Sequence, residues 1–270
     1  MSGQLRILEA VLKEYEHNLS MTDYFTKRSI TPETAKKFRL GYAGKGSKAS
    51  AECGFVEAVK SGVFHPDKRG NLNDMFRYRV IFPIFSADNT LIGFGGRAIY
   101  STAAPKYLNS PESEVFKKRE ILFGLNLLTT HLPTIVLCEG YFDVISLQQA
   151  GIPAVAPLGT ALSATQASLL TTAADEVVIF GDNDDAGRNA VKRSLSILRE
   201  AGMAARVVVN STAAKDADEV VVKYGGKAAS AFVDEAVDGN RWLLDNTDDE
   251  KEKAKLFFEI VKEKGGSCYA

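Results

Sequence analysis

The sequence predicts an α/β protein in three parts: an N-terminal mixed α+β basic subdomain over residues 1–130, a central parallel-sheet subdomain over 131–225, and a C-terminal helical segment over 226–270. Three observations support this division. Strand and helix patterns alternate from residue 133 onward, which is typical of a parallel sheet covered on both faces. Two apolar runs between residues 77 and 99 flank a short polar loop. The chain after residue 218 has a helical pattern.

The N-terminal part is expected to begin with helices. Apolar residues at helical spacing predict a helix over residues 4–19. Thr31 followed by Pro32 is typical of an N-cap with proline at the first helical position, so a second helix is expected there, ending at Gly41. A third, short helix is expected over residues 55–61, after a polar loop.

A β-hairpin is expected next. Residues 77–85 and 91–99 read as strands, and the polar residues 87–90 as the turn between them. Pro83 has no amide hydrogen, so it should lie at a sheet edge or a bulge. Ser110 before Pro111 resembles a helix cap, which predicts a helix or helix pair reaching about residue 130.

The central part alternates regularly. Strands are expected near residues 134–138, 153–156, 177–181 and 205–209, and helices near 142–150, 164–172 and 186–201. Gly151 and Gly202 follow two of these helices, at a position where glycine commonly ends a helix. The C-terminal segment carries an apolar stripe that we expect to pack as core. That stripe contains Trp242, Leu243, Leu244, Phe257, Phe258, Ile260 and Val261.

Composition excludes several classes of protein. The chain has 270 residues, 45% of them hydrophobic and 25% charged, which is ordinary for a globular protein. No apolar run approaches the roughly 20 residues of a membrane span, so no membrane role is expected. Cys53, Cys138 and Cys268 are far apart, which argues against a disulfide framework and against a zinc site in this chain. A reducing cytoplasm is the expected compartment.

Charge is distributed unevenly although the net charge is −1. Residues 66–119 contain nine Lys or Arg against five Asp or Glu, whereas residues 139–250 contain nine against eighteen. One part could therefore hold a phosphate backbone and the other metal ions. Ordinary solvated surface charge is the alternative.

Acidic residues follow three of the expected strands. They are Glu139 and Asp143, then Asp182 and Asp184, then Asp216 and Asp218. The carboxyl ends of parallel strands share one sheet edge, so these carboxylates should meet there. Crowded carboxylates repel each other unless a cation is present, and hard divalent cations prefer oxygen ligands. A metal site for phosphate chemistry is therefore expected, with helix capping as the alternative for each group taken alone.

The basic part interleaves cationic and aromatic side chains. The cationic residues are Arg77, Arg79, Arg97, Lys106, Lys117, Lys118 and Arg119, and the aromatic ones include Phe76, Tyr78, Tyr107 and Phe116. Such residues could flank a nucleic-acid groove, because aromatic rings stack on bases. The aromatic rings could equally be the core of the hairpin.

Several motifs resemble a known family. Glu139-Gly-Tyr-Phe-Asp143, Leu158-Gly-Thr-Ala-Leu162 and Asp182-Asn-Asp-Asp-Ala-Gly187 resemble the Toprim domain. Arg79-Val-Ile-Phe-Pro-Ile84, Ile92-Gly-Phe-Gly-Gly-Arg97, Pro105-Lys-Tyr-Leu-Asn-Ser-Pro-Glu112 and Val115-Phe-Lys-Lys118 are similar to the RNA polymerase core of bacterial DnaG-type primases. The resemblance extends over residues 20–230 and is narrower than Toprim alone.

The resemblance implies roles for named positions. It implies catalytic roles for Glu139, Asp182 and Asp184, and binding of Mg²⁺ or Mn²⁺ by these three together with Asp216 and Asp218. Asp143 is expected to cap the following helix or to support the site from behind. Template and nucleotide are expected to contact Arg77, Arg79, Arg97, Lys106, Asn109, Lys117 and Lys118.

The sequence departs from the family pattern at several points. Asn183 stands where the family usually has glycine, and asparagine also tolerates left-handed backbone. Arg119 stands where glycine is common. The usual zinc ribbon is not present in this sequence, and the usual C-terminal helicase-binding domain is missing or much reduced. The chain is therefore expected to be either a core fragment or a compact primase of a phage or mobile element.

The resulting functional hypothesis is a DNA-directed RNA polymerase that makes short RNA primers on single-stranded DNA from NTPs. It would act in the bacterial cytoplasm at the replication fork, and its expected partner is a replicative helicase or a separate zinc-binding module. Two alternatives remain open at this point. One is a non-catalytic accessory protein that binds single-stranded nucleic acid, and the other is a Toprim nuclease.

Overall fold

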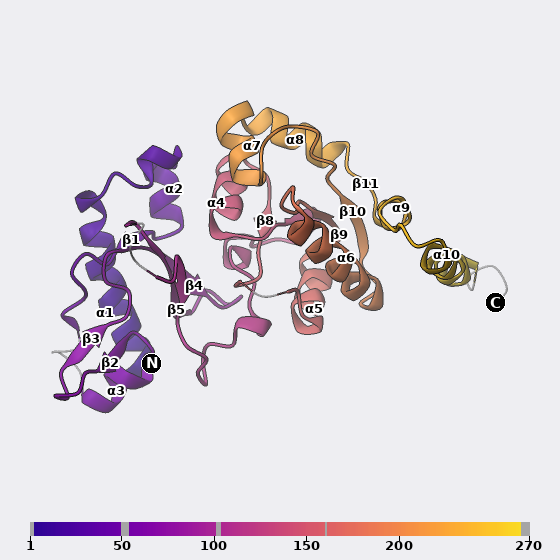
Figure 1. Ribbon diagram of the computed structural model, residues 1–270. Coiled ribbons are helices and arrows are strands. Elements are labelled where there is room, and N and C mark those ends of the chain that lie inside the picture. The colour runs from indigo at the N-terminus through magenta and orange to yellow at the C-terminus, as the bar shows by residue number, and fades with distance from the viewer. Residues whose placement is uncertain (1–2, 50–53, 101–103, 160, 266–270) are drawn as a thin grey trace.

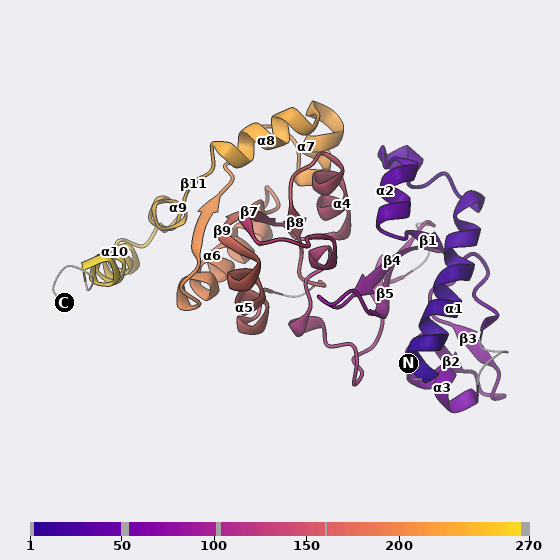
Figure 2. The same cartoon turned by 180° about the vertical axis from the view of Figure 1, so that it is seen from behind.

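Two β-sheets lie side by side in the computed structural model, with helices around both and a helical extension at the C-terminus (Figure 1). The structure describes residues 3–49, 54–100, 104–159 and 161–265. The N-terminal helices lie at one end of the molecule, and the last two helices lie at the other (Figures 1 and 2). The central sheet lies between them, so both halves of the chain can contribute to a site at its edge.

Helix α1 (Gly3–His17) places one apolar face against the first sheet, where Leu8, Leu12 and Tyr15 are fully buried. Two 3₁₀ turns, η1 (Asn18–Met21) and η2 (Thr26–Arg28), lead to α2 (Pro32–Lys37). The Thr31 hydroxyl accepts a hydrogen bond from the Thr34 amide, which confirms the predicted cap. Helix α3 (Phe55–Lys60) is also where it was expected.

Gly41 does not end a helix, because α2 stops at Lys37 and Gly41 begins strand β1 (Gly41–Tyr42). A Cβ atom at Gly41 would lie 2.7 Å from the Tyr15 Cβ atom of α1. Glycine is therefore required here by close packing of the strand on the helix, a contact that local sequence does not reveal.

The first sheet is antiparallel, with strand order β1-β4-β5-β6. The predicted hairpin is confirmed as β4 (Arg79–Phe85) and β5 (Leu91–Ala98), and β6 (Tyr107–Asn109) extends the sheet. Pro83 pairs with Phe94 of β5 but lies beyond the two residues of β4 that pair with β1, so its other side meets no strand. A small separate hairpin is formed by β2 (Phe64–Pro66) and β3 (Leu72–Asp74).

The prediction of a helix or helix pair from Pro111 to about residue 130 is wrong. This segment contains only two 3₁₀ turns, η4 (Lys118–Glu120) and η5 (Leu125–Leu127). The Ser110 hydroxyl accepts a hydrogen bond from the Phe94 amide of β5 and caps no helix. The Gln166 side chain donates to the backbone carbonyls of Lys118 and Ile121, so distant partners satisfy this backbone in place of a helix.

The second sheet has strand order β11-β10-β9-β7-β8. The strand and helix alternation is confirmed by strands β7 (Leu132–Leu137), β8 (Ala154–Val155), β9 (Ala174–Ile179) and β10 (Ala204–Val207), which are parallel. Strand β11 (Val237–Asp238) is antiparallel and was not expected. The chain runs from β7 outward to β8 and then returns to the other side of β7 as β9, so the strand order reverses between β7 and β9. A crevice forms at such a reversal.

Helices cover both faces of this sheet, as expected. They are α4 (Tyr141–Gln149), α5 (Ala164–Ala173), α6 (Asp185–Glu200), α7 (Ala217–Tyr224) and α8 (Gly226–Asp234). One core lies under α5 and α6, and the other contains α4, α7 and the hairpin. In the second core Phe82 of β4 stacks on Tyr141 of α4, with ring centroids 4.5 Å apart. The two sheets are therefore joined through shared apolar packing.

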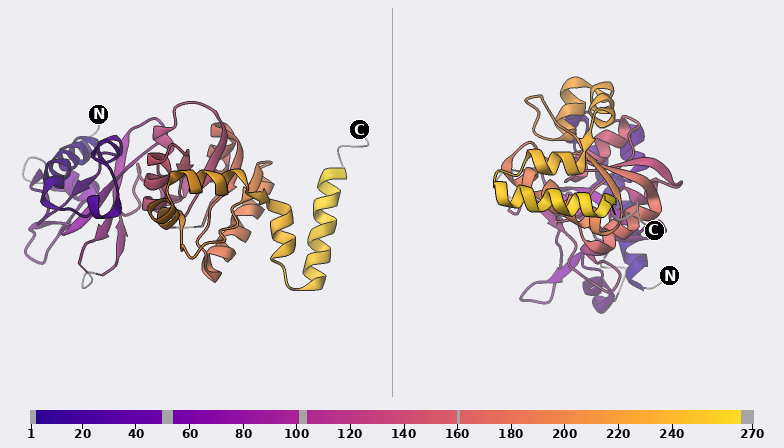
Figure 3. Two further views of the ribbon diagram at one scale, coloured as in Figure 1. Left: turned by 90° about the horizontal axis from the view of Figure 1, so that it is seen from above. Right: turned by 90° about the vertical axis from the view of Figure 1, so that its right-hand side faces the viewer.

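The C-terminal helices are α9 (Gly239–Asp245) and α10 (Glu250–Gly265), and they project from the sheet (Figure 3). Trp242 and Ile260 are buried as predicted, but Phe257 is 51% exposed and Phe258 is 71% exposed. The expectation that the whole stripe packs as core is therefore wrong, because only one side of α10 contacts the body. No helix among the described residues is long and apolar enough to cross a membrane.

Candidate active site

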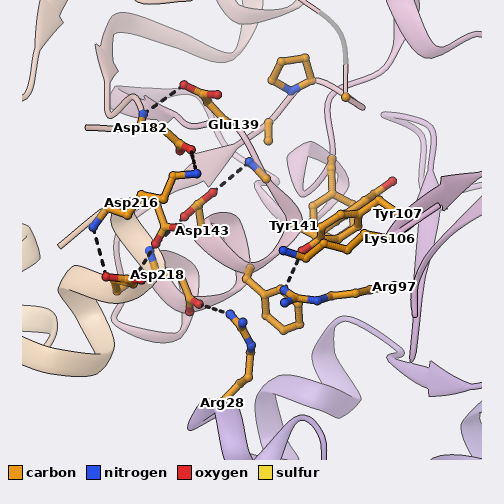
Figure 4. A pocket seen from close by; sticks show the side chains of 18 of the residues that line it. Arg28, Arg97, Lys106, Tyr107, Glu139, Tyr141, Asp143, Asp182, Asp216 and Asp218 are labelled. Atoms are coloured by element: carbon orange, nitrogen blue, oxygen red, sulfur yellow. Dashed lines mark hydrogen bonds and ion pairs between the residues drawn. The ribbon is translucent and has the colours of Figure 1, made fainter. Parts of the chain in front are cut away.

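A pocket of about 590 Å³ lies at the carboxyl ends of β7 and β9 and extends to the hairpin of the first sheet. One side carries the acidic groups that follow the strands of the parallel sheet. The other carries cationic and aromatic groups from β5, β6 and η2 (Figure 4). The reversal of strand order between β7 and β9 opens this edge, and a candidate site residue follows the end of each strand, Glu139 after β7 and Asp182 after β9.

Glu139 and Asp182 are in direct contact across the two strand ends. The Asp182 amide donates a 3.0 Å hydrogen bond to Glu139 Oε1. Lys215 Nζ lies 2.9 Å from Asp182 Oδ2 and 3.6 Å from Asp184 Oδ2, so a cation already lies between these two carboxylates. Asp184 also caps α6, where its Oδ1 accepts a hydrogen bond from the Gly187 amide.

The protonation of these acids reflects their surroundings. Burial, followed by repulsion from Asp182 and Asp184, raises the pKa of Glu139. Burial also raises the pKa of Asp182, against the effect of Lys215. The hydrogen bond from the Gly187 amide lowers the pKa of Asp184. Carboxylates whose pKa is raised by crowding are stabilised as anions by a bound cation.

Asp216 is the N-cap of α7, and Asp218 lies in the first turn of that helix. Asp216 lines the pocket and caps the helix by accepting a hydrogen bond from the Glu219 amide. Asp218 is only 4% exposed, and its carboxylate contacts Arg28 and Ser146. Both residues line the pocket, but the carboxylate of Asp218 is engaged by Arg28 and Ser146.

Asp143 is largely buried and lines the acidic side of the pocket. Its Oδ2 accepts a hydrogen bond from the Gly140 amide at the start of α4, and its Oδ1 accepts one from the Asp218 amide. Burial raises the pKa of Asp143 strongly. Asp143 therefore caps α4 and also ties α4 to α7.

Arg97, Lys106 and Asn109 line the opposite side of the pocket. The Arg97 guanidinium donates a 2.8 Å hydrogen bond to the Tyr107 hydroxyl and lies 5.3 Å from the Phe142 ring centroid. Asn109 Oδ1 accepts a hydrogen bond from the Tyr141 hydroxyl. An arginine held in place by aromatic rings is preorganised to bind an anion.

The structure does not bring the other predicted basic residues to this pocket. Arg79 is only 5% exposed and donates a hydrogen bond to the Lys106 carbonyl, so it supports the hairpin and is not free to bind phosphate. Arg77 is exposed but does not line the pocket. Lys117 pairs with Glu120 at 3.5 Å, and Lys118 lies beside it on η4.

Several pocket residues were missed by the sequence analysis. They are Arg28, Tyr141, Phe142, Lys215 and Lys223. Lys215 directly precedes Asp216 in the sequence, and this position beside an acidic pair could have identified it as a site residue. No local sequence pattern could have identified Arg28, because it lies 190 residues before its partner Asp218. Thr160 of the Leu158–Leu162 motif is outside the described residues.

The carboxylates share one pocket but do not form a finished metal site. Within the described ranges, no three His, Cys, Asp or Glu side chains already converge closely enough to hold a metal ion. Glu139, Asp182 and Asp216 line the same cavity, and Lys215 occupies the position beside Asp182.

Comparisons with known proteins agree with this geometry. Residues 9–129 match the family model of the DNA primase catalytic core, N-terminal domain, and residues 136–221 match the Toprim-like model. The solved Escherichia coli primase catalytic core is 30% identical and superimposes with a TM-score of 0.82, over 90% of this chain and 82% of that one. The chain belongs to the family of bacterial DnaG-type primases. The match to the primase core favours this interpretation over the nuclease and accessory-protein alternatives.

Other primases are also similar. The Clostridium acetobutylicum DNA primase is 41% identical over 237 residues, which are 83% of this chain and 39% of that protein. The Aquifex aeolicus DNA primase is 40% identical over 80% of this chain and 44% of that protein. The solved zinc-binding and RNA polymerase domains of the Aquifex primase superimpose with a TM-score of 0.84 at 32% identity, over 94% of this chain and 66% of that chain. This chain therefore spans about two fifths of the length of these curated primases.

Proposed function

We propose that the pocket is the active centre of a DNA-directed RNA polymerase that synthesises RNA primers on single-stranded DNA. One observation carries this proposal: Glu139, Asp182 and Asp216 face Arg97 and Lys106 across one cavity. Acidic groups on one side and fixed cations on the other suit a nucleoside triphosphate with its counter-ions. Membership of the primase family supports the same activity.

The proposed substrates are NTPs, a DNA template and the growing RNA primer. A solved DnaG catalytic domain that is 28% identical to this chain is described as bound to single-stranded DNA, which supports the template assignment. Arg97 and Lys106 would hold phosphate oxygens of the nucleotide, and Arg97 is already oriented by Tyr107. The exposed Arg77 and Lys117 and the half-buried Lys118 would contact template or primer away from the pocket.

The proposed cofactor is Mg²⁺ or Mn²⁺, held by Glu139, Asp182, Asp184 and Asp216. The residues fit such an ion because they offer carboxylate oxygens only, and because Asp182 and Asp184 already accept a cation, the Lys215 ammonium. When bound, a divalent ion would supply charge neutralisation at the phosphates and activation of the primer 3′-hydroxyl. The chain itself contributes orientation, since Glu139 is fixed by the Asp182 amide and Asp216 by the start of α7.

The wider setting is also a proposal. We place the protein in the bacterial cytoplasm at the replication fork, with a replicative helicase as a possible partner. Zinc is assigned to a separate module, because the cysteine spacing in this chain does not suit a zinc site. The three-part division at about residues 130 and 225 is kept as a proposal for experiments with shortened chains.

The test is incorporation of labelled NTPs on a single-stranded DNA template with Mg²⁺ or Mn²⁺. The wild-type protein is expected to make short RNA, and Asp182→Ala is expected to make none above background. Asp175→Asn, which changes an exposed carboxylate at the start of β9, is the matched control and should retain activity. Absence of metal-dependent synthesis by the wild type, or full activity of Asp182→Ala, would contradict the proposal.

A further inference from the structure

Both carboxylate oxygens of Asp218 already have protein partners, although the residue lines the pocket. Its Oδ2 forms a 2.7 Å ion pair with Arg28 Nη1, and its Oδ1 accepts a hydrogen bond from the Ser146 hydroxyl of α4. The side chain is only 6% exposed. A buried carboxylate with a charged partner and a second donor is already stabilised as an anion.

The backbone of Asp218 is fixed as well. Its amide donates a 3.0 Å hydrogen bond to Asp143 Oδ1 of α4. Asp216, two residues earlier, lines the pocket at the start of the same helix. The contacts of Asp218 therefore determine where the first turn of α7 lies, and with it the position of Asp216 and Lys215.

Arg28 reaches this position from the N-terminal half of the chain. It is the last residue of η2, and its guanidinium lies 4.6 Å from the Phe142 ring centroid and 6.0 Å from that of Tyr24. Arg97 lies against the same two rings, at 5.3 and 5.6 Å. Figure 4 shows Arg28 pointing to Asp218 and Arg97 pointing to Tyr107. The charge of Arg28 is therefore compensated by Asp218, whereas Arg97 forms no ion pair with a carboxylate in the described part of the chain.

We propose that Arg28 and Asp218 act as one positioning unit that holds η2, α4 and α7 together, and that Asp218 is not a ligand of the catalytic metal. This differs from the metal-binding role that the family resemblance implies for Asp218. The proposal concerns the site of the proposed polymerase and rests on that function only for its kinetic readout. Arg97 and Lys106 then remain as the cations of this wall that contact the nucleotide.

The first readout is a double-mutant cycle on protein treated with EDTA, using Arg28→Met, Asp218→Asn and the double variant in denaturant unfolding. We expect each single variant to shift the unfolding midpoint by a similar amount, and the double variant to shift it by clearly less than the two shifts added together. Additive shifts would show that the two residues do not act together. Should the single variants not fold, Arg28→Lys and Asp218→Glu provide a milder cycle.

The second readout is Mn²⁺ binding without nucleotide or DNA, measured by electron paramagnetic resonance. The double variant keeps the net charge of the wild type, since it removes one positive and one negative charge. We expect its Mn²⁺ affinity to stay within about three-fold of the wild type, whereas Asp182→Asn should weaken binding by about ten-fold or more. A loss in the double variant as large as that in Asp182→Asn would make Asp218 a ligand and overturn the proposal.

The third readout separates positioning from stability alone. We expect the double variant to lower kcat/KM for NTP by about ten-fold at a temperature where it is fully folded, and Arg28→Lys to retain most of the wild-type value. The control is the pair Arg206 and Glu176, an ion pair between β10 and β9 whose arginine is similarly exposed and whose carboxylate is more exposed than that of Asp218. Arg206→Met with Glu176→Gln should lower stability and leave kcat/KM unchanged.

These experiments distinguish failure of the positioning proposal from failure of the proposed polymerase function. If the wild type makes no primer, the unfolding and Mn²⁺ readouts still decide whether Arg28 and Asp218 form one unit and whether Asp218 is a ligand. If the double variant has the kcat/KM of the wild type, the pair only stabilises the fold and the positioning role is wrong.

Discussion

The Asp182 amide donates a 3.0 Å hydrogen bond to Glu139 Oε1, which joins the ends of two neighbouring parallel strands at the site. Because the contact uses one oxygen of Glu139, the other oxygen remains to face the pocket. Glu139 thus has two separable properties: an oxygen that accepts a hydrogen bond and a negative charge that the proposed chemistry needs.

Two substitutions separate these properties. Glu139→Gln retains an acceptor but removes the charge, and Glu139→Ala removes both. We expect both variants to lose primer synthesis by roughly 100-fold or more. Only Glu139→Ala should also lose about 1 kcal/mol of unfolding free energy, from the missing hydrogen bond. Wild-type synthesis by Glu139→Gln would show that the charge is dispensable.

The pH dependence of metal binding should report the raised pKa values of Glu139 and Asp182. Burial and repulsion among these acids raise both values, so protonation begins above the pH at which ordinary carboxylates titrate. As the pH is lowered, Mn²⁺ affinity should therefore begin to fall before the ordinary carboxylate range near pH 4 is reached. An Mn²⁺ titration at a series of pH values measures this, and a constant affinity down to about pH 4 would contradict it.

The same pKa values predict the stability of the metal-free protein. A carboxyl group whose pKa is higher in the folded than in the unfolded state favours folding most below its unfolded pKa, and that contribution is lost as the pH rises through the folded pKa. Added Mn²⁺ should offset the loss at neutral pH, since it binds the ionised form. Thermal unfolding with and without Mn²⁺ at pH 5 and pH 7.5 should show the larger metal effect at pH 7.5.

Lys215 should compete with the metal ion. Its ammonium lies between Asp182 and Asp184, where a divalent ion would be held. Removing one charge at about 4 Å in water changes the interaction by about 1 kcal/mol, so Lys215→Met should strengthen Mn²⁺ binding roughly five-fold. Lys227→Met, at an exposed position on α8, is the control. Weaker binding by Lys215→Met would mean that Lys215 helps to assemble the site.

Gly95 should tolerate no side chain. A Cβ atom there would lie 2.3 Å from the Tyr141 hydroxyl oxygen, and Tyr141 cannot easily move because it stacks on Phe82 and donates to Asn109. Gly95→Ala should cost about 1–3 kcal/mol in denaturant unfolding. Gly93→Ala, whose Cβ would meet its nearest neighbour at 3.1 Å, should cost less. Equal effects would show that the Tyr141 contact does not require glycine.

Helix α10 offers a comparison within one element. Phe258 is 71% exposed and Ile260 is 7% exposed. Phe258→Ser should change the unfolding free energy by less than about 0.5 kcal/mol, whereas Ile260→Ser should cost about 2 kcal/mol or more. A large loss from Phe258→Ser would mean that this face of α10 is covered in solution.

Much of the site could be predicted because its signals are local. An acidic motif follows each of the strands β7 and β9, and parallel strands bring their carboxyl ends to one edge, so Glu139 and Asp182 were expected to meet. The hairpin and the cap at Thr31 were likewise predicted from patterns of a few residues. Where the physical cause lies within a short segment, the sequence alone is sufficient.

The remaining features depend on contacts between segments far apart in the sequence. The helix expected after Ser110 does not form, because Gln166 and β5 supply its backbone partners. The charge pattern of the sequence placed Arg79 and Arg97 in one basic group. The fold nevertheless buries Arg79, whereas Arg97 lines the pocket.

The sequence by itself therefore determined the alternation of strands and helices in the parallel sheet and the acidic edge of that sheet, since periodicity and strand ends are local properties. Only the tertiary structure decided which charges reach the pocket. Arg28 and Asp218 are 190 residues apart, and their ion pair exists because two sheets pack on one apolar core. Burial and pairing depend on that packing, and no local pattern specifies it.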